Sequence, residues 1–376
     1  MDIKKLEEKL KEIGEPKFRL EQIKKAVFQD GVSSFSEITT ISKSLREELQ
    51  RTFDVPNGHQ MSTGGILSFE VEKILEAKDK QSIKALFKLY DGNLIESVLI
   101  SPKPGDWSAC ISSQVGCPLS CGFCETGRMG LKRNLTAEEI TDQVLFWKNY
   151  LRTARSGPTA APQDKNCGRT ATQKVTDIVY MGMGEPFLNW DNVKESLKNL
   201  TDPKLFGFGS RSISVSTSGI PEGIEKLAEE FPQINLALSL HFADDQKRSE
   251  IMPINRKNNL EALRKSLQNY FSKTKRKIFL EYIMLEKIND SKEDAEKLVR
   301  FVKSIGKLQL LHVNLIRYNY PEKGSDPSIG IGSLRPSSRE RIVEFKNFLL
   351  QNHIPVTIRK SLGEEIQGAC GQLAGK

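Results

Sequence analysis

The spacing of hydrophobic residues along the first part of the chain is that of helices. The segments "IKKLEEKLKEIG", "RLEQIKKAVFQDG" and "SKSLREELQRTF" place apolar residues three or four positions apart. Gly14 and Gly31 follow the first two segments, as glycine commonly does at helix ends. The pattern predicts a small helical module over residues 1–55.

The hydrophobic period then changes to the alternation of strands. In "KALFKLYDGNLIESVLI" the alternation surrounds Asp91 and Gly92, a pair that favours a tight hairpin turn. The following "WSACISSQ" keeps this β character. We therefore expect a β-hairpin connector over residues 56–105, between the helical module and a larger domain over residues 106–376.

In the larger domain, a short apolar strand followed by an amphipathic helix recurs six times. The predicted strands are 108–112, 175–180, 212–216, 234–240, 277–284 and 312–316. Right-handed crossovers in series wind a parallel sheet one way, so we predict an α/β fold with a partial (β/α)6 barrel. A doubly wound open sheet is the alternative. In such barrels the chemistry lies at the carboxyl ends of the strands.

Two helix starts carry the signature of a capping box, in which a hydroxyl residue precedes a glutamate by three positions. Thr136 with Glu139 and Ser337 with Glu340 have this relation.

Residues 152–174 interrupt the series of strands and helices with a segment rich in Thr, Ala, Pro and Gly, and we interpret them as an exposed loop. Phosphate contact is an alternative for this loop, because it holds five basic residues and one acid.

The composition is that of a soluble globular protein. Lys and Arg number 56 against 48 Asp and Glu, and this formal net charge of +8 suits a polyanionic partner without requiring one. The start lacks an apolar signal region, and no apolar run approaches the ~20 residues that a membrane span needs. We expect a cytoplasmic protein without membrane contact. Six unevenly spaced cysteines do not resemble a secreted disulfide framework.

Three cysteines, Cys117, Cys121 and Cys124, lie within eight residues of the loop "VGCPLSCGFCETG". A structural zinc site needs four ligands, and no second CxxC or HxxxH accompanies these three. A four-iron cluster held by three thiolates keeps one iron open to a substrate or cofactor. The loop therefore favours an iron–sulfur cluster, with zinc or an accidental grouping as the alternatives.

The CxxxCxxC spacing, with Phe123 before the last cysteine, resembles the radical S-adenosylmethionine (SAM) enzymes. The surrounding segments narrow the resemblance to the RlmN/Cfr family of adenosine RNA methyltransferases, from "FRLEQI" to the last residue. These segments are "CISSQVGC", "KRNLTAEEI", "MGMGEPFLN", "STSG", "SLH", "MPIN", "HVNLIRYN" and "ACGQLAG".

The resemblance implies one [4Fe-4S] cluster on the three cysteines and two SAM molecules per turnover. One SAM methylates a carrier cysteine, which matches Cys370, and the other is cleaved to a 5′-deoxyadenosyl radical that takes hydrogen from the new methyl group. Cys110 matches the cysteine that resolves the protein–RNA thioether by forming a disulfide. Glu96 matches the candidate base; without the resemblance we would read it as a surface acid on an edge strand.

The resemblance also carries over a set of SAM-contacting positions near the predicted strand ends. They are Gly184, Glu185, Ser216, Ser239, Leu240, His241 and Asn314. Taken alone, His241 is as well explained as a packed or capping histidine, and Asn314 as a turn former. Cys167 matches no cysteine of the family.

The expected partner is RNA with an unstacked adenine, because the ring edge is inaccessible inside a helix. The family implies 23S ribosomal RNA, with transfer RNA a second target in some members, and a reductant such as flavodoxin or ferredoxin. We expect a monomer. RNA contacts should come from the amino-terminal helices, the basic loops, and residues such as Arg128, Lys132, Arg133 and Arg211.

Two reactions occur in the family, methylation at adenine carbon 2 and at carbon 8. "MGMGEPFLN", with Pro186, and "QLAG" resemble the carbon-2 enzymes, whereas "HVNLIRYN" and "GLKRNLTAEEITDQVL" resemble the carbon-8 branch. We favour carbon 2 because the first of these segments borders the pocket. Glu125 and the 152–174 insertion depart from the family pattern. The alternatives of another class are an iron–sulfur redox protein and a zinc-stabilised RNA-binding protein.

Overall fold

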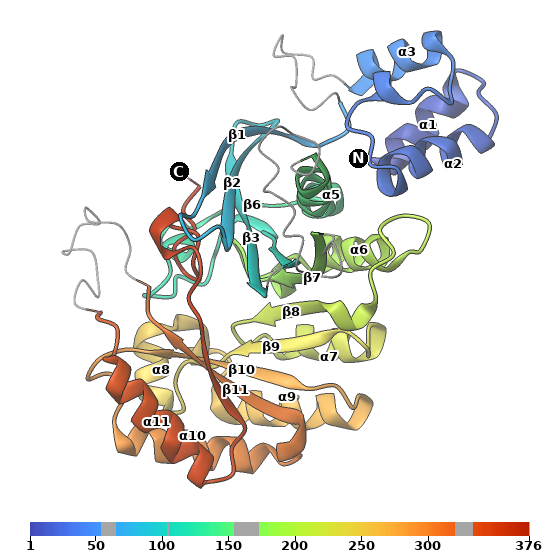
Figure 1. The fold of residues 1–376 in the computed structure, drawn as a ribbon. Coiled ribbons are helices and arrows are strands. Elements are labelled where there is room, and N and C mark those ends of the chain that lie inside the picture. Colours follow the sequence, from blue (N-terminus) through green and yellow to red (C-terminus); the bar gives the residue numbers. More distant parts are fainter. Residues whose placement is uncertain (54–64, 104, 154–172, 320–333, 376) are drawn as a thin grey trace, which may run out of the picture.

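Among the residues that the structure describes, ten strands form one sheet that runs from beside the helical module to the carboxyl-terminal region (Figure 1). The computed structural model describes residues 1–53, 65–103, 105–153, 173–319 and 334–375. The strands of this sheet are β1 (Phe69–Glu76), β2 (Ser82–Leu89), β3 (Leu94–Lys103), β4 (Asp106–Cys110), β7 (Lys174–Tyr180), β8 (Ile213–Thr217), β9 (Asn235–Ser239), β10 (Ile278–Met284), β11 (Leu311–Arg317) and β12 (Val356–Arg359). A separate small hairpin pairs β5 (Gln114–Gly116) with β6 (Leu131–Asn134).

The sheet confirms the predicted winding. From β4 through β7, β8, β9, β10 and β11 the strands are parallel and lie in chain order, whereas a doubly wound sheet would reverse its order at a switch point. β12 extends the parallel series by a further strand, which the sequence pattern did not predict. On the other side, the antiparallel strands β1 to β3 continue the same sheet. The β-hairpin at Asp91 and Gly92 is therefore part of the main sheet.

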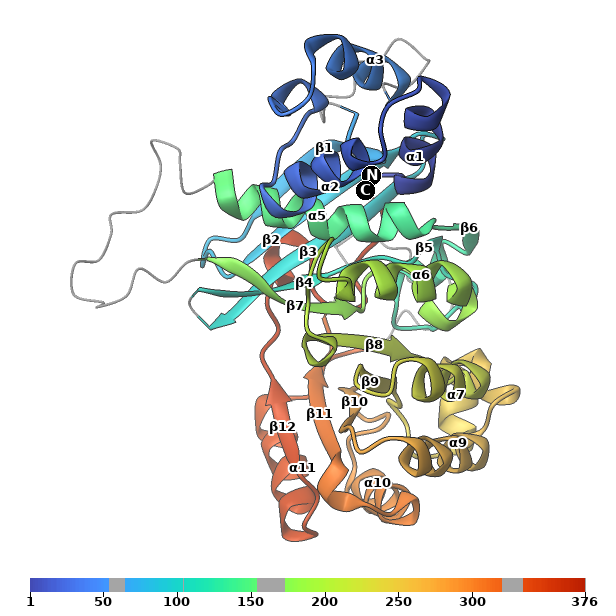
Figure 2. The ribbon, with the colours of Figure 1, turned by 90° about the vertical axis from the view of Figure 1, so that its right-hand side faces the viewer.

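Helices flank the parallel strands on one side of the sheet, as Figure 2 shows for α6, α7, α9 and α10. The α-helices are α1 (Ile3–Glu12), α2 (Phe18–Lys24), α3 (Lys43–Phe53), α4 (Glu125–Arg128), α5 (Ala137–Thr153), α6 (Trp190–Thr201), α7 (Pro221–Glu230), α8 (Asp245–Ile251), α9 (Leu260–Lys273), α10 (Lys292–Ile305) and α11 (Arg339–Gln351). None of the described helices combines the length and the apolar character of a membrane span.

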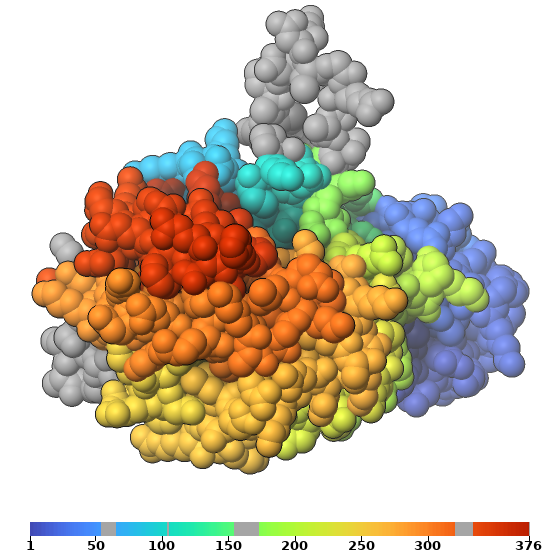
Figure 3. Space-filling view, turned by 90° about the horizontal axis from the view of Figure 1, so that it is seen from below, coloured from blue at the N-terminus to red at the C-terminus, as the bar shows by residue number. Residues whose placement is uncertain are grey.

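The amino-terminal helices dock on α5, which lies between them and the sheet in both ribbon views (Figures 1 and 2). Lys148 Nζ donates a 3.1 Å hydrogen bond to the carbonyl oxygen of Phe28, and Arg152 donates to the carbonyl oxygens of Asp30 and Gly31. The acceptors lie in the π-helical turn that continues α2 (Lys25–Gln29) and in the two residues that follow this turn. Seen from below, the module lies at the opposite end of the molecule from the carboxyl-terminal segment (Figure 3).

One of the two predicted capping boxes is confirmed and the other is wrong. Thr136 Oγ1 accepts the Glu139 backbone N–H at 3.2 Å, and the Glu139 carboxylate accepts the Thr136 N–H at 2.9 Å. For α11 the capping residue is Ser338 rather than Ser337, because the Ser338 hydroxyl accepts the backbone N–H of Arg341. The Ser337 hydroxyl instead donates a 2.7 Å hydrogen bond to Asp290.

Candidate active site

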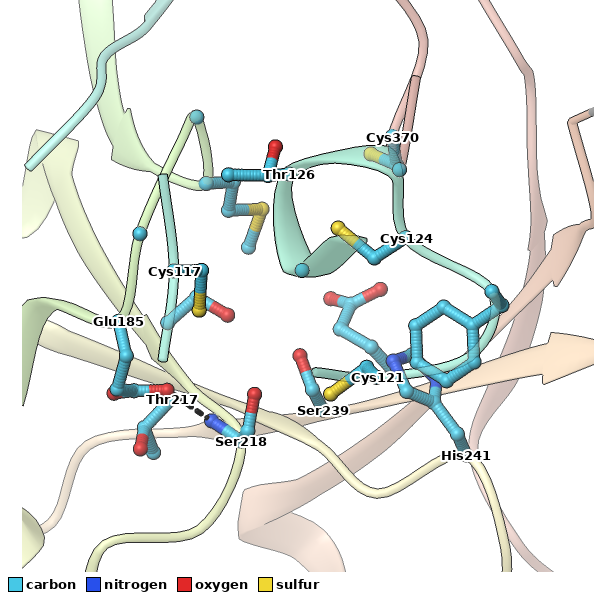
Figure 4. Close-up of a pocket in the computed structure, with 18 of the residues that line it drawn as sticks. Cys117, Cys121, Cys124, Thr126, Glu185, Thr217, Ser218, Ser239, His241 and Cys370 are labelled. Atoms are coloured by element: carbon cyan, nitrogen blue, oxygen red, sulfur yellow. Dashed lines mark hydrogen bonds between the residues drawn. The ribbon is translucent and has the colours of Figure 1, made fainter. Parts of the chain in front are cut away.

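A cavity of about 1010 Å³, its mouth included, opens at the carboxyl ends of the parallel strands, where the winding of the sheet predicts the chemistry (Figure 4). Its walls come from the cysteine loop, from the ends of β7, β8 and β9, from β10, and from the carboxyl-terminal segment. The lining residues used below are Cys117, Cys121, Cys124, Thr126, Gly184, Glu185, Ser216, Thr217, Ser218, Ser239, His241, Glu281, Arg359 and Cys370.

The small β5–β6 hairpin holds the cysteine loop. Gly116, the last residue of β5, has a φ of 77°, and an added Cβ there would lie 1.8 Å from the carbonyl oxygen of Gly130. Only glycine allows this close approach, which places Cys117 at the cavity wall. The loop is also held by a 2.9 Å hydrogen bond from the Gly122 N–H to the carbonyl oxygen of Ile251, at the end of α8.

The three cysteine side chains surround one open region, as Figure 4 shows. Burial raises the pKa of Cys117 to about 12 and also raises the pKa values of Cys121 and Cys124, and the neighbouring sulfurs raise the pKa values of Cys117 and Cys121 further. Three such thiolates need a cationic group among them. Among the described residues, no three His, Cys, Asp or Glu side chains lie close enough to hold a single metal ion. Thiolates that each bind a different iron stand further apart, so the donor set fits an iron–sulfur cluster.

Glu185 lines the same cavity, on the side of Cys117 (Figure 4). Gly184 before it has a φ of 100°, and an added Cβ would meet the Gln114 side chain at 2.5 Å. The Glu185 carboxylate accepts backbone N–H groups from Ser218 at 2.7 Å and Phe187 at 3.3 Å. Burial raises the pKa of Glu185 to about 7, although these hydrogen bonds act to lower it. A buried carboxylate whose charge is this costly is suited to a cationic ligand.

The ends of β8 and β9 supply hydroxyl groups and a histidine. Ser216, Ser239 and His241 line the cavity together with Thr217 and Ser218, two positions that the carried-over set left out. His241 adopts a left-handed conformation with φ 55°, and its Nδ1 accepts the backbone N–H of Ile283 at 3.1 Å. Burial, with the nearby charge of Arg248, lowers the pKa of His241 to about 3, so the imidazole is neutral.

Two expected SAM residues stand back from the cavity. Leu240 is fully buried, and Asn314 is not among the lining residues. Asn314 Nδ2 donates to the Oε1 of Glu281 at 2.9 Å, and Glu281 itself lines the cavity. The other oxygen of Glu281, Oε2, is buried and has no hydrogen-bond partner among the described residues. Asn314 therefore contacts a residue that lines the cavity, Glu281, rather than lining the cavity itself.

The structure brings Cys370 and Cys110 together. Cys370 lines the main cavity and a neighbouring one of about 600 Å³, which Cys110 also lines. Burial raises the pKa of the Cys110 thiol to about 12, and the adjacent Cys370 raises it further. Arg359 lines both cavities, and its guanidinium lies 3.5 Å from the Glu281 carboxylate. The two cysteines thus share one cationic neighbour.

Glu96 is not the surface acid that its sequence suggests when read alone. It is 1% exposed on β3 and forms an ion pair of 2.8 Å with Lys84 on β2. It lines neither cavity. Its carboxylate contacts the carboxyl-terminal segment, because Oε2 accepts the backbone N–H of Ala374 at 2.8 Å.

Among the expected RNA contacts, Arg133 is already paired. It donates two hydrogen bonds, of 2.7 and 2.8 Å, to Glu139 and another to Asp91, which speaks against a phosphate contact. Arg128 pairs with Glu125 at 3.0 Å, and Arg211 donates to Gln233. Lys132 is exposed. Cys167 and most of the 152–174 insertion lie outside the described residues.

Several residues in or near the two cavities carry no sequence signal of their own. Arg359, Glu281 and Lys84 belong to strands, where a charged residue normally indicates a solvent face. Asn319 lies beside Cys370, whose carbonyl oxygen it contacts at 3.4 Å, and its buried Oδ1 has no partner among the described residues. Only the three-dimensional convergence of β2, β10, β12, the residues after β11 and the carboxyl-terminal segment identifies these four positions.

Comparison with known proteins supplies independent information. Residues 1–55 match the family model for the amino-terminal domain of ribosomal RNA large subunit methyltransferases. The chain is 39% identical to the "Ribosomal RNA large subunit methyltransferase Cfr" of Clostridium botulinum, over 95% of this chain and 92% of that protein. It is 40% identical to the "Probable dual-specificity RNA methyltransferase RlmN" of Chlorobaculum tepidum, over 99% and 91%. A crystal structure of a radical SAM methyltransferase from Sphaerobacter thermophilus superposes with a TM-score of 0.85 and 34% identity, over 100% of this chain and 98% of that one.

Proposed function

The chain belongs to the RlmN/Cfr family of radical SAM RNA methyltransferases, and within it we propose that the protein methylates carbon 2 of an adenosine in 23S ribosomal RNA through a methylated Cys370. As a member, it is a SAM-dependent RNA methyltransferase, and the family implies both SAM and an iron–sulfur cluster. The position on adenine, the cysteine carrier, the [4Fe-4S] type and the use of two SAM molecules are the proposal.

The observation that carries the proposal is the convergence of three features on one cavity. The cysteine loop, the polar strand ends and Cys370 all line it, although they are far apart in the sequence. When bound, the cluster and SAM would supply a methyl group and an abstracting radical. Cys117, Cys121 and Cys124 would hold the cluster, and Glu185 would accept from the SAM ammonium group. The hydroxyls of Ser216 and Ser239, with neutral His241, would orient the remaining polar groups of SAM.

Cys370 is suited to carry a methyl group between SAM and RNA. Adenine carbon 2 is not nucleophilic, so a direct polar transfer from the SAM sulfonium is barred, and a covalent carrier divides that step into feasible ones. Cys370 lines the cavity together with the three loop cysteines, and its residue is exposed. Cys110, a neutral thiol in the adjoining cavity, would form the disulfide that releases the product.

Glu96 would take the proton that leaves carbon 2. Its carboxylate contacts the segment that bears Cys370, at Ala374, and this contact ties the candidate base to the carrier cysteine. Arg359, between the two cysteines and Glu281, would stabilise thiolate charge on either sulfur. We assign substrate binding on the RNA side to the amino-terminal module, which matches the amino-terminal domain of ribosomal RNA methyltransferases.

Methylation at carbon 8 of adenine is the second candidate reaction, because a relative named Cfr and one named RlmN are about equally similar to this chain. The test is mass spectrometry of ribosomal and transfer RNA from cells with and without this gene. The proposal predicts that 2-methyladenosine from ribosomal RNA is lost with the gene. Loss of 8-methyladenosine instead would overturn the assignment to carbon 2. Loss of 2-methyladenosine from transfer RNA as well would identify a second substrate.

A further inference from the structure

Both carboxylate oxygens of Glu96 are occupied in this structure. Oε1 accepts a hydrogen bond from Lys84 Nζ at 2.8 Å, and Oε2 accepts the backbone N–H of Ala374 at 2.8 Å. The two charged side chains are almost fully buried, Lys84 at 6% and Glu96 at 1% exposure. Each oxygen keeps a second lone pair, and the two hydrogen bonds fix the orientation of the carboxylate.

Lys84 also holds the carboxyl-terminal segment directly. Its Nζ donates to the carbonyl oxygen of Gln367 at 3.2 Å. The buried ion pair thus contacts this segment on both sides of Cys370, at Gln367 through Lys84 and at Ala374 through Glu96. Removing either charge would leave the other uncompensated in the interior, so the two side chains keep each other in place.

The opposite side of the segment is held by the helix that follows the cysteine loop. The Glu125 N–H donates to the carbonyl oxygen of Gly371 at 2.8 Å, and the Thr126 hydroxyl donates to the carbonyl oxygen of Leu373 at 2.6 Å. Figure 4 shows Cys370 on the same side of the cavity as Thr126 and Cys124. Residues 367–374 are therefore clamped between the β2–β3 hairpin and α4.

We propose that Lys84 is a positioning residue for the carrier cysteine. Together with Glu96 it forms a latch, the Lys84–Glu96 pair and its bonds to Gln367 and Ala374, which fixes Cys370 at the cavity. The latch thereby couples the position of Cys370 to the position of Glu96. The roles of Cys370 and Glu96 in this inference rest on the proposed function.

Three variants of the full chain test the latch. Lys84→Met removes the charge at similar length, and Lys84→Arg keeps it. Lys88→Met is the matched control, because Lys88 lies on the same face of β2 and makes no recorded hydrogen bond or ion pair with residues 367–374 of the described chain. Folding and iron content of each variant are checked first.

The first readout is hydrogen exchange of the peptide that contains Ala374, in protein without RNA or SAM. We expect Lys84→Met to exchange at least about 5-fold faster than the wild type, since the bond from Ala374 loses its fixed acceptor, whereas Lys84→Arg and Lys88→Met stay within about 2-fold. If Lys84→Met folds poorly, Glu96→Gln replaces it with the same expectation. Equal protection in the charge-removing variants and the wild type would overturn the latch.

The second readout is the rate at which Cys370 gains a methyl group from SAM in the absence of RNA, followed by peptide mass spectrometry. We expect this rate to fall about 10-fold in Lys84→Met and to be restored in Lys84→Arg. An Arg variant as slow as the Met variant would contradict positioning by charge. A wild-type protein that never methylates Cys370 would contradict the proposed function instead, and the exchange measurement would still decide the latch.

Discussion

Arg248 Nη2 donates a 2.7 Å hydrogen bond to the carbonyl oxygen of Ser218, at the end of β8. The same guanidinium donates through Nε to the carbonyl oxygen of Leu240, beyond the end of β9, at 3.0 Å. Arg248 is fully buried, and its Nη1 donates a 2.8 Å hydrogen bond to the Oδ1 of Asn255. A single side chain thus joins two of the strand ends that form the cavity floor.

This arrangement makes Arg248 a residue on which the folded site depends. Arg248→Met should lower the free energy of unfolding by about 2–5 kcal/mol, because at least two buried carbonyl oxygens lose their donors and each costs about 1–3 kcal/mol. Urea unfolding measures the change. Arg264→Met, which removes an arginine paired with Glu261 on the outside of α9, is the control and should leave the unfolding midpoint close to that of the wild type. An unchanged unfolding midpoint in Arg248→Met would refute this role.

His241 predicts a loss of stability in acid. The folded protein keeps the imidazole neutral, since its pKa is lowered to about 3, whereas the unfolded chain takes up a proton below about 6.5. Stability is therefore lost as the pH falls from 6.5 toward 3, by roughly 2 kcal/mol over the first one and a half pH units. Unfolding followed against pH should show this slope, and His241→Gln should lack it. The same acid slope in His241→Gln would assign the loss to other groups.

The raised pKa of Glu185 predicts the opposite dependence of stability on pH. Burial raises its pKa to about 7, so the folded state of the ligand-free protein holds a proton that the unfolded state releases above 4.5. Stability from this group is present below pH 4.5 and is lost as the pH rises to 7, by roughly 3 kcal/mol. Glu185→Gln should remove this dependence and weaken SAM binding about 10-fold or more, measured by calorimetry. Glu195→Gln serves as the control, at a partly exposed residue of α6 that pairs with Lys198. Unchanged SAM affinity in Glu185→Gln would exclude an ammonium contact.

The sequence predicts the winding of the sheet well, because six strand-and-helix units each have a clear hydrophobic period. It misses β1 and β12, which are short or largely exposed and so lack that period. The cysteine loop, Glu185 and the Ser216–His241 strand ends follow from local motifs. Glu281, Arg359 and Lys84 could not be predicted, because a charge on a strand has meaning only once the strand's neighbours are known.

Cys110 gives a prediction about product release. If Cys110 forms the disulfide that frees the RNA, Cys110→Ala should leave the chain covalently joined to RNA, since a thioether is not broken by denaturant or by thiol reagents. A denaturing gel with labelled ribosomal RNA fragments detects the joined species. We expect it in Cys110→Ala and not in the double variant Cys110→Ala with Cys370→Ala. Free methylated RNA released by Cys110→Ala at the wild-type rate would contradict the assignment.

The central claim is that the methyl group passes through Cys370. The most direct measurement compares the methylated adenosine formed on ribosomal RNA by the reconstituted wild type and by Cys370→Ala, with 5′-deoxyadenosine release as the check that the cluster still cleaves SAM. The account predicts 2-methyladenosine from the wild type and none from Cys370→Ala. Formation of 2-methyladenosine by Cys370→Ala would contradict it.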